Sequence, residues 1–468
     1  MLSKSLQYDV AVLGAGSAGF AAARATAAGG LRTVVLEGGA ETGGLCILRG
    51  CMPSKALLHA AEALHLARLG KIWGLRIPAA GFDFARVMAR KRAMVEDFAA
   101  FRRQQLKEGP FDFLRAQARF ADAHTLELAG TGGAPRCLTA RHFVISTGSV
   151  PAPPPCPGLE EAGFWTSDDA LSLKKLPRSL VVLGGGPVAV ELAQFFCRMD
   201  VKVTLIQRSA HILRESDPDA AAALETVLRR EGVEIFAPSR LLRAFRQGRS
   251  KGVEFDYNNG TRRAAAEAIL AATGRTPNTA GLGLDKIGVR TDGGRIVANA
   301  EMRTSARHIY AAGDCTGPHQ IVHLAVEQGE VAAHNILHPR RRRRMDERLL
   351  TRVVFTEPQA ATVGLTEREA RARGIRFLAA SYPFADHGKS LILEAKDGFV
   401  KLLADEKTGV IIGGACVGPL GGELIHEIVA AMAGKLTARD LAAMPHYHPT
   451  LAEIWTYPAA ELAERINC

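Results

Sequence analysis

Two cysteines stand five positions apart just before a segment with helical spacing. Cys46 and Cys51 precede Pro53, which suits the first position of a helix, and apolar residues recur at helical spacing through residues 56–66. A helix N-terminus favours negative charge and would hold a reactive thiolate at neutral pH. No second cysteine or histidine pair at metal-ligand spacing accompanies them, so we expect no metal. The pattern favours a redox-active disulfide over two structural thiols.

A glycine-rich turn lies upstream of the cysteines. A β-rich run at residues 8–13 leads into this turn, an alanine-rich helix follows, and a second strand ends at Glu37. Glycines at this spacing allow a tight turn and close approach to a pyrophosphate, and a carboxylate at the strand end can accept from ribose hydroxyls. The turn residues are Gly14, Gly16, Ser17 and Gly19. The segment therefore predicts a dinucleotide site.

Joined to the cysteine pair, this fingerprint resembles the FAD-binding start of the pyridine nucleotide-disulfide oxidoreductases, the family of dihydrolipoamide dehydrogenase, glutathione reductase and mercuric reductase. The resemblance covers essentially the full length. It implies an α/β fold with two Rossmann-like dinucleotide-binding domains, for FAD and NAD(P), and a C-terminal α+β interface domain. The expected boundaries are residues 1–150 and 273–340 for the two parts of the FAD domain, 151–272 for the NAD(P) domain, and 345–468 for the interface domain.

The same resemblance assigns further residues. Lys55 matches the lysine beside the flavin, with Glu191 as its ion-pair partner. Cys51 matches the thiol facing the flavin, and Cys46 the thiol that exchanges with substrate. The further expected cofactor contacts are Gly44, Thr147, Gly148, Gly274, Arg275, Gly313 and Asp314.

A second glycine turn, with Gly184, Gly186 and Ala189, follows a proline-rich break at residues 151–157. Gln207 stands at the offset from Gly184 that Glu37 has from Gly14, so the acid is missing, and arginines flank its place. Guanidinium groups pair with the 2′-phosphate of NADP, which a carboxylate would repel. Arg208 and Arg214 therefore favour NADP, with NAD still possible, and glutathione reductase-like members carry two arginines at matching places.

Near the C-terminus, the run from His446 to Glu453 contains an HPTLAE sequence that resembles the histidine-glutamate loop of dihydrolipoamide dehydrogenase and glutathione reductase. By this resemblance His448 is the base that accepts a thiol proton, and Glu453 fixes its tautomer. In the family this loop serves the other subunit, which implies a homodimer.

The substrate stays open between a small dithiol or disulfide and a lipoyl group on a carrier protein. The HPTLAE loop favours dihydrolipoamide, reduction of a low-molecular-weight disulfide comes second, and mercury reduction third. Mercuric reductases carry a tyrosine where His448 stands and two adjacent cysteines near the C-terminus, whereas this tail has Cys468 alone.

Composition bounds the remaining classes. The chain has 468 residues, 47% of them hydrophobic, and eight cysteines, too few for a disulfide scaffold. Arginines at residues 340–344 supply five of the +11 net charges and indicate a solvated linker rather than a nucleic-acid site. With neither an apolar span nor a signal peptide recognised, we expect a cytoplasmic protein without a membrane anchor.

Overall fold

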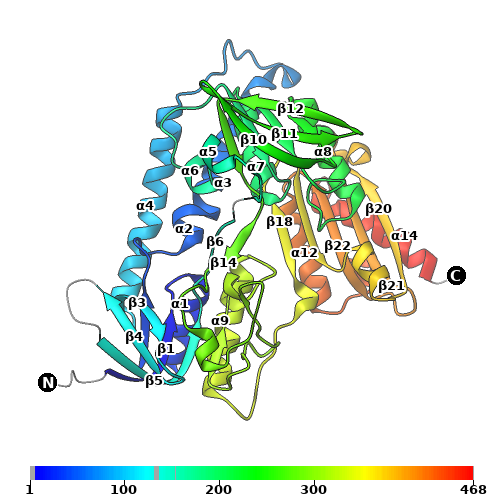
Figure 1. Ribbon diagram of the computed structural model, residues 1–468. Coiled ribbons are helices and arrows are strands. Elements are labelled where there is room, and N and C mark those ends of the chain that lie inside the picture. Colours follow the sequence, from blue (N-terminus) through cyan, green and yellow to red (C-terminus); the bar gives the residue numbers. More distant parts are fainter. Residues whose placement is uncertain (1–5, 131–135, 153, 467–468) are drawn as a thin grey trace. The chain divides into compact units, whose positions relative to one another are not determined.

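The computed structural model describes residues 6–130, 136–152 and 154–466 (Figure 1). Cys468 lies outside these residues. The chain divides into two compact units, each assembled from three segments. Unit 1 contains residues 1–53, 89–152 and 275–345, and unit 2 contains residues 54–88, 153–274 and 346–468. The three domains expected from the sequence, one of them in two parts, are finer than these units, and their boundaries stay a prediction.

Unit 1 is built on a six-stranded sheet with a parallel core. β1 pairs in parallel with β2 and with β5. β4 pairs antiparallel with both β3 and β5 and so lies between these two strands. A late strand, β17, pairs in parallel with β5. The strands are β1 (Leu6–Leu13), β2 (Thr33–Glu37), β3 (Asp112–Phe120), β4 (Thr125–Gly130), β5 (Arg136–Ile145) and β17 (Ile309–Ala311). Short strands β6 (Ser149–Pro151) and β14 (Arg275–Pro277) pair with each other, as do β15 (Thr291–Asp292) and β16 (Arg295–Ile296).

Helix α1 (Ser17–Ala28) packs against α9 (Val322–Leu337), and both share a core with the parallel strands. Val10 and Val12 of β1 are fully buried there, as expected for a parallel strand covered on its faces. The cysteine segment forms α2 (Leu45–Arg49) and the start of α3 (Cys51–Arg68). The long helix α4 (Phe84–Glu108) returns the chain to β3.

Unit 2 holds a second parallel sheet in the strand order β13-β7-β8-β9. Helix α7 (Pro187–Arg198) links β7 to β8 and buries Leu192, Phe195 and Phe196. A separate antiparallel sheet of β10, β11 and β12 follows in the chain. The elements are β7 (Ser179–Leu183), β8 (Lys202–Ile206), β9 (Glu234–Phe236), β13 (Ala268–Ala271), β10 (Arg240–Gln247), β11 (Ser250–Tyr257), β12 (Gly260–Ala266), α5 (Leu159–Ala162), α6 (Ser167–Ala170) and α8 (Pro218–Glu231).

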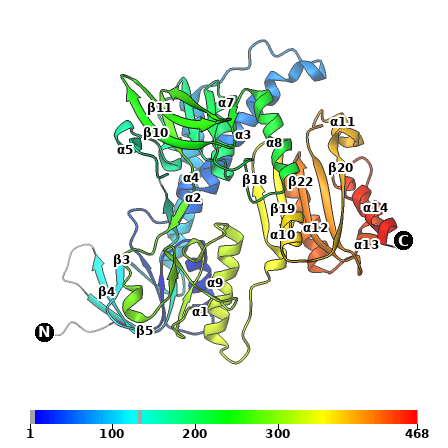
Figure 2. The ribbon, with the colours of Figure 1, turned by 45° about the vertical axis from the view of Figure 1, so that its right-hand side comes forward.

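The last part of unit 2 is a five-stranded antiparallel sheet in the order β18-β19-β22-β21-β20, with its strands side by side in Figure 2. Helix α12 packs on β19 and β22, and α14 packs on β20 and β21. Trp455 is fully buried in this core. The elements are β18 (Thr351–Val354), β19 (Gln359–Gly364), β20 (Phe377–Pro383), β21 (Phe399–Asp405), β22 (Ile411–Gly418), α10 (Glu367–Ala372), α11 (Gly388–Ile392), α12 (Gly421–Ala433), α13 (Ala438–Ala443) and α14 (Thr456–Ile466).

These elements confirm the expected fold class: one mainly parallel and one wholly parallel sheet, in each of which the first strand leads into a glycine turn, and an α+β C-terminal part. In the described part of the chain, no helix is both long enough and apolar enough to span a membrane.

Candidate active site

The cysteine pair lies at the junction between a short helix and a long one. Cys46 is in α2, Cys51 is the first residue of α3, and both are partly buried. The sequence predicts Pro53 at the first helical position, but the helix begins two residues earlier. Pro53 is tolerated at the third position because the first-turn amides have no partner within the helix. Cys51 therefore stands at the N-terminus of this helix.

A charged group that no sequence pattern indicated, Arg102, lies next to Cys46. It comes from α4, its guanidinium lies 4.0 Å from the ring of Phe20, and it is close enough for an electrostatic interaction with Cys46. Burial lowers the pKa of Arg102, and Cys46 acts to raise it. A cation at this place favours the thiolate form of the cysteine.

The first glycine turn is shaped by close backbone contacts. Gly14 has a φ of +103°, and a Cβ there would stand 2.4 Å from the carbonyl oxygen of Ser146. A Cβ at Gly19 would stand 2.0 Å from the Gly14 oxygen, so neither position accepts a side chain. At Gly16, the N-cap of α1, a Cβ would meet no atom within 4 Å, so space is open where Ser17 begins the helix. The turn therefore leaves room at a helix N-terminus for an anion.

Glu37 ends β2 beside this turn. Its carboxylate accepts hydrogen bonds from the amides of Ala15, at 3.1 Å, and Gly39, at 2.7 Å. Gly44 approaches the same turn, because a Cβ on it would stand 2.9 Å from the Cα of Gly16. Both predicted residues therefore lie at the nucleotide turn.

A second group of predicted residues gathers around Ser149. The hydroxyl of Ser149 donates to Asp314 at 2.6 Å, and Arg275 donates to the Ser149 hydroxyl and carbonyl at 2.8 and 2.7 Å. Thr147 and Gly148 directly precede it, and the Oγ1 of Thr147 is buried with no protein hydrogen-bond partner in the described structure. Gly313 precedes Asp314, and its amide donates to Gln328 at 2.7 Å. Ser149 was missed because its role as a link is visible only in three dimensions.

The second glycine turn repeats the first one in unit 2. A Cβ at Gly184 would stand 2.4 Å from the Ala272 oxygen, Gly186 is the N-cap of α7, and Ala189 is fully buried. Gly274 lies just after Ala272, at the end of this unit's segment.

The strand end that carries Glu37 in unit 1 carries Gln207 in unit 2. Gln207 is buried, and its Oε1 accepts from the Arg208 amide at 3.0 Å. The Leu213 amide donates to the Gly185 oxygen at 2.7 Å, which returns the loop containing Arg208 and Arg214 to the glycine turn. Both arginine side chains are exposed, and neither makes an ion pair with a described residue. The loop after this strand end therefore carries two exposed positive charges.

Lys55 and Glu191 form the expected ion pair. The Nζ of Lys55 lies 2.8 and 3.1 Å from the two carboxylate oxygens of Glu191. The amide of Phe355 donates to the same carboxylate at 2.9 Å, and the Phe355 ring lies 4.6 Å from the Lys55 Nζ. Phe355 follows β18, so a residue from the C-terminal segment of unit 2 fixes the carboxylate and covers the ammonium group.

His448 and Glu453 also form the expected pair. The Nδ1 of His448 lies 3.0 and 3.2 Å from the Glu453 carboxylate oxygens, and the His448 side chain is 77% exposed. The neighbouring His446 is bound differently, since its two nitrogens contact Glu427, at 2.6 Å, and the Met444 carbonyl, at 3.0 Å. Burial acts to lower the pKa of His446, but these hydrogen bonds raise it. Of these two histidines, His448 is the one that presents a ring nitrogen to solvent with a carboxylate behind it.

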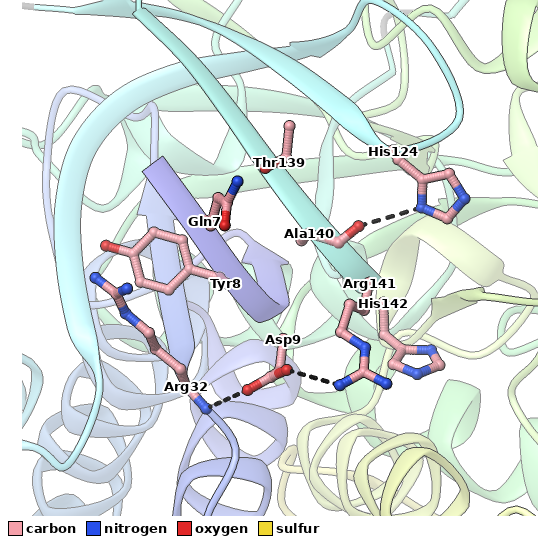
Figure 3. A pocket seen from close by; sticks show the side chains of 9 residues that line it. All are labelled: Gln7, Tyr8, Asp9, Arg32, His124, Thr139, Ala140, Arg141 and His142. Atoms are coloured by element: carbon pink, nitrogen blue, oxygen red, sulfur yellow. Dashed lines mark hydrogen bonds and ion pairs between the residues drawn. The ribbon is translucent and has the colours of Figure 1, made fainter. Parts of the chain in front are cut away.

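Unit 1 also contains a cavity of about 680 Å³, and Figure 3 shows the residues that line it. Gln7, Tyr8 and Asp9 line it at the amino end of β1, whereas the glycine turn follows the carboxyl end of that strand. Asp9 accepts from the Arg141 side chain at 3.2 Å and from the Arg32 amide at 3.0 Å (Figure 3). None of the predicted site residues lines this cavity.

Comparison with known proteins decides the family. The pyridine nucleotide-disulphide oxidoreductase profile matches residues 8–329, and the dimerisation-domain profile of the same family matches residues 350–459. The chain belongs to the pyridine nucleotide-disulphide oxidoreductases. It is 34% identical to dihydrolipoyl dehydrogenase of Geobacillus stearothermophilus over 98% of this chain and 97% of that one. It is 35% identical to mercuric reductase of Streptomyces lividans over 97% and 96%.

Solved structures agree with this assignment. The HOCl-induced flavoprotein disulfide reductase of Escherichia coli superposes with a TM-score of 0.85 and 28% identity, over 97% of this chain and 99% of that one. As a pyridine nucleotide-disulphide oxidoreductase, the protein is an FAD-dependent disulfide oxidoreductase that uses NAD(P)H. The cradle above Gly16 and the buried Thr147 oxygen fit a nucleotide that brings its own hydrogen-bonding groups.

Proposed function

We propose that this oxidoreductase transfers electrons between NADP(H) and a small dithiol or disulfide through Cys46 and Cys51, and that its favoured substrate is dihydrolipoamide or a lipoyl group on a carrier protein. The observation that supports the dithiol is the His448–Glu453 pair, which offers an exposed imidazole with Nδ1 held by a carboxylate. A dithiol must lose a proton before it attacks a disulfide, and a neutral imidazole accepts one.

The chemistry proceeds by thiol–disulfide exchange. His448 accepts the proton of one substrate thiol, whose sulfur attacks Cys46 and breaks the Cys46–Cys51 bond. The second substrate thiol then displaces Cys46, so the substrate leaves as a disulfide and two electrons remain on the cysteine pair. FAD, when bound, would supply the two-electron redox chemistry that connects the cysteine pair with NADP(H). Lys55, held by Glu191, would lie beside the flavin, and the other expected cofactor residues would hold the two nucleotides.

A second candidate is NADPH-dependent reduction of a low-molecular-weight disulfide, by the same exchange in reverse. The exposed Arg208 and Arg214 beside Gln207 favour it, since these charges suit a 2′-phosphate. This is also the observation on which the NADP preference rests.

We further propose a homodimer in which His448 serves the cysteine pair of a second copy. The match of residues 350–459 to the family's dimerisation domain supports this assembly. The 77% exposure of the His448 side chain in the single chain agrees with an imidazole that completes its site on another surface.

The test compares substrates at steady state. Dihydrolipoamide oxidation is measured with NAD⁺ and NADP⁺, and lipoamide, glutathione disulfide and Hg(II) are each supplied with NADH and NADPH. We expect dihydrolipoamide to give the highest kcat/KM. Turnover of glutathione disulfide alone establishes the second candidate, and turnover of Hg(II) without either disulfide overturns both.

A further inference from the structure

Behind the His448–Glu453 pair lies a second histidine that the sequence did not indicate. His387 precedes α11 and is fully buried. Its Nε2 lies 3.4 Å from Oε1 of Glu453, the same oxygen that lies 3.2 Å from Nδ1 of His448. The Glu453 carboxylate, itself buried, is therefore flanked by one exposed and one buried imidazole.

The other ring nitrogen of His387 fixes its tautomer. Nδ1 lies 2.8 Å from the hydroxyl of Ser390, which is also fully buried. Burial lowers the pKa of His387, with Glu453 opposing the shift, so the ring is neutral at neutral pH. A neutral ring that faces a carboxylate through Nε2 must carry its proton there, since two lone pairs would repel each other. Ser390 accordingly donates to Nδ1.

The surroundings leave few other charges to act on this group. The titratable groups that face His387 are Glu453, in the 3-10 turn before α14, His448 in the preceding loop, and Tyr457 of α14, whose ring centre lies 6.3 Å away. A Cβ at Gly388 would stand 4.0 Å from Cε1 of His448, so the same segment also approaches the exposed imidazole.

We propose that His387 is a positioning residue that donates from Nε2 to Glu453 and thereby holds the carboxylate against His448. This role rests on the proposed function of His448 as the thiol base. In the described structure the buried Nε2 has no hydrogen-bond partner, and its 3.4 Å separation from Glu453 is longer than an ordinary hydrogen bond. Contacts of this kind commonly shorten when substrate binds.

The consequence concerns proton affinity. With His448 neutral, the His448–Glu453 pair carries one negative charge, and the His387 donor stabilises that state. Without the donor, the pair binds a proton more readily. The acid limb of kcat/KM for dihydrolipoamide oxidation therefore moves to higher pH, by about one pH unit for the loss of a hydrogen bond to a charged group.

The experiment compares two substitutions at one site by their pH profiles. His387→Leu removes the donor, and we expect the acid limb to rise, with about tenfold lower kcat/KM on its acid side. His387→Gln places an amide N–H near the Nε2 position and restores the wild-type limb. Reduction of a dye by NADPH, which needs no thiol base, serves as the measure of an intact fold and bound flavin.

If His387→Leu keeps the wild-type limb, or His387→Gln shifts it as far as His387→Leu, the positioning role is wrong. If His387→Leu does not fold, Ser390→Ala takes its place in the test. We expect Ser390→Ala to move the acid limb to higher pH by a smaller amount, because Glu453 alone then holds the tautomer of His387. No shift in Ser390→Ala counts against the proposal. His448→Gln distinguishes failure of the positioning role of His387 from failure of the proposed function. If this variant leaves dithiol oxidation intact, the assignment of His448 as the base is wrong.

Discussion

The preference for NADPH is open to a direct test at the end of β8. Arg208 and Arg214 are both exposed, and the loop that carries them is returned to the glycine turn by the hydrogen bond from Leu213 to Gly185. We expect the double variant Arg208→Ala/Arg214→Ala to lose affinity for NADPH and to keep its affinity for NADH, because only NADPH carries the 2′-phosphate.

The size of the loss follows from the exposure of the two arginines. A hydrogen bond to a charged group contributes about 1.5–3 kcal/mol to binding, and we take the lower end of this range for each arginine because both side chains are exposed to solvent. Two contacts then amount to about 3 kcal/mol, or roughly a 100-fold fall in kcat/KM for NADPH. The wild-type value for NADPH should also fall as salt is added, since these charges are screened.

Initial rates of dye reduction with NADPH and NADH provide the assay, because this reaction does not depend on the thiol substrate. Arg178→Ala is the matched control: its side chain is 93% exposed, and it precedes β7 at the end opposite the glycine turn. An equal loss for both nucleotides in the double variant, or an equal effect of Arg178→Ala, refutes the reasoning.

Three further outcomes can be measured. Cys46→Ser should abolish thiol turnover and leave dye reduction intact; loss of both activities would contradict an exchange role for Cys46. Glu191→Gln should lower the free energy of unfolding, measured in urea, by about 2 kcal/mol. This loss is smaller than that for breaking a fully buried pair, because the Lys55 side chain is 32% exposed although that of Glu191 is 5% exposed. An unchanged free energy of unfolding would show that the pair does not stabilise the fold. Burial, together with Glu62, raises the pKa of Glu357 to about 8, so the ionisation of this carboxyl lowers the stability of the fold as pH rises from about 4.5 to 8. Glu357→Gln should therefore raise the melting temperature at pH 8 and not at pH 5. An equal effect at both pH values would count against this reasoning.

The parts of the site that the sequence predicts are those written in short segments. Gly14 and Gly184 indicate their turns in the sequence because a tight turn between a strand and a helix needs glycine at a fixed spacing. The His448–Glu453 pair is predicted for a similar reason, since both residues lie in one loop. The Lys55–Glu191 contact came from family resemblance, because nothing in the local sequence joins residues so far apart.

The parts that were missed depend on tertiary packing. His387 meets Glu453 only because the segment before α11 packs beside the 3-10 turn before α14, and the intervening residues carry no pattern that indicates it. Phe355 acts partly through its backbone amide, which any residue type could supply. Arg102 looks like an ordinary helix arginine until its burial beside Phe20 is known.

The order of segments in unit 1 also has a consequence for synthesis on the ribosome. The sheet that carries the first glycine turn gains β17 only at Ile309–Ala311, and α9, which packs on α1, comes later still. A nascent chain that has emerged only as far as β5 therefore has an open strand edge and an uncovered apolar helix face. Unit 1 is completed only after the whole middle segment of unit 2, residues 153–274, has been translated. Truncations that end before Ile309 should therefore yield aggregating fragments that bind no flavin.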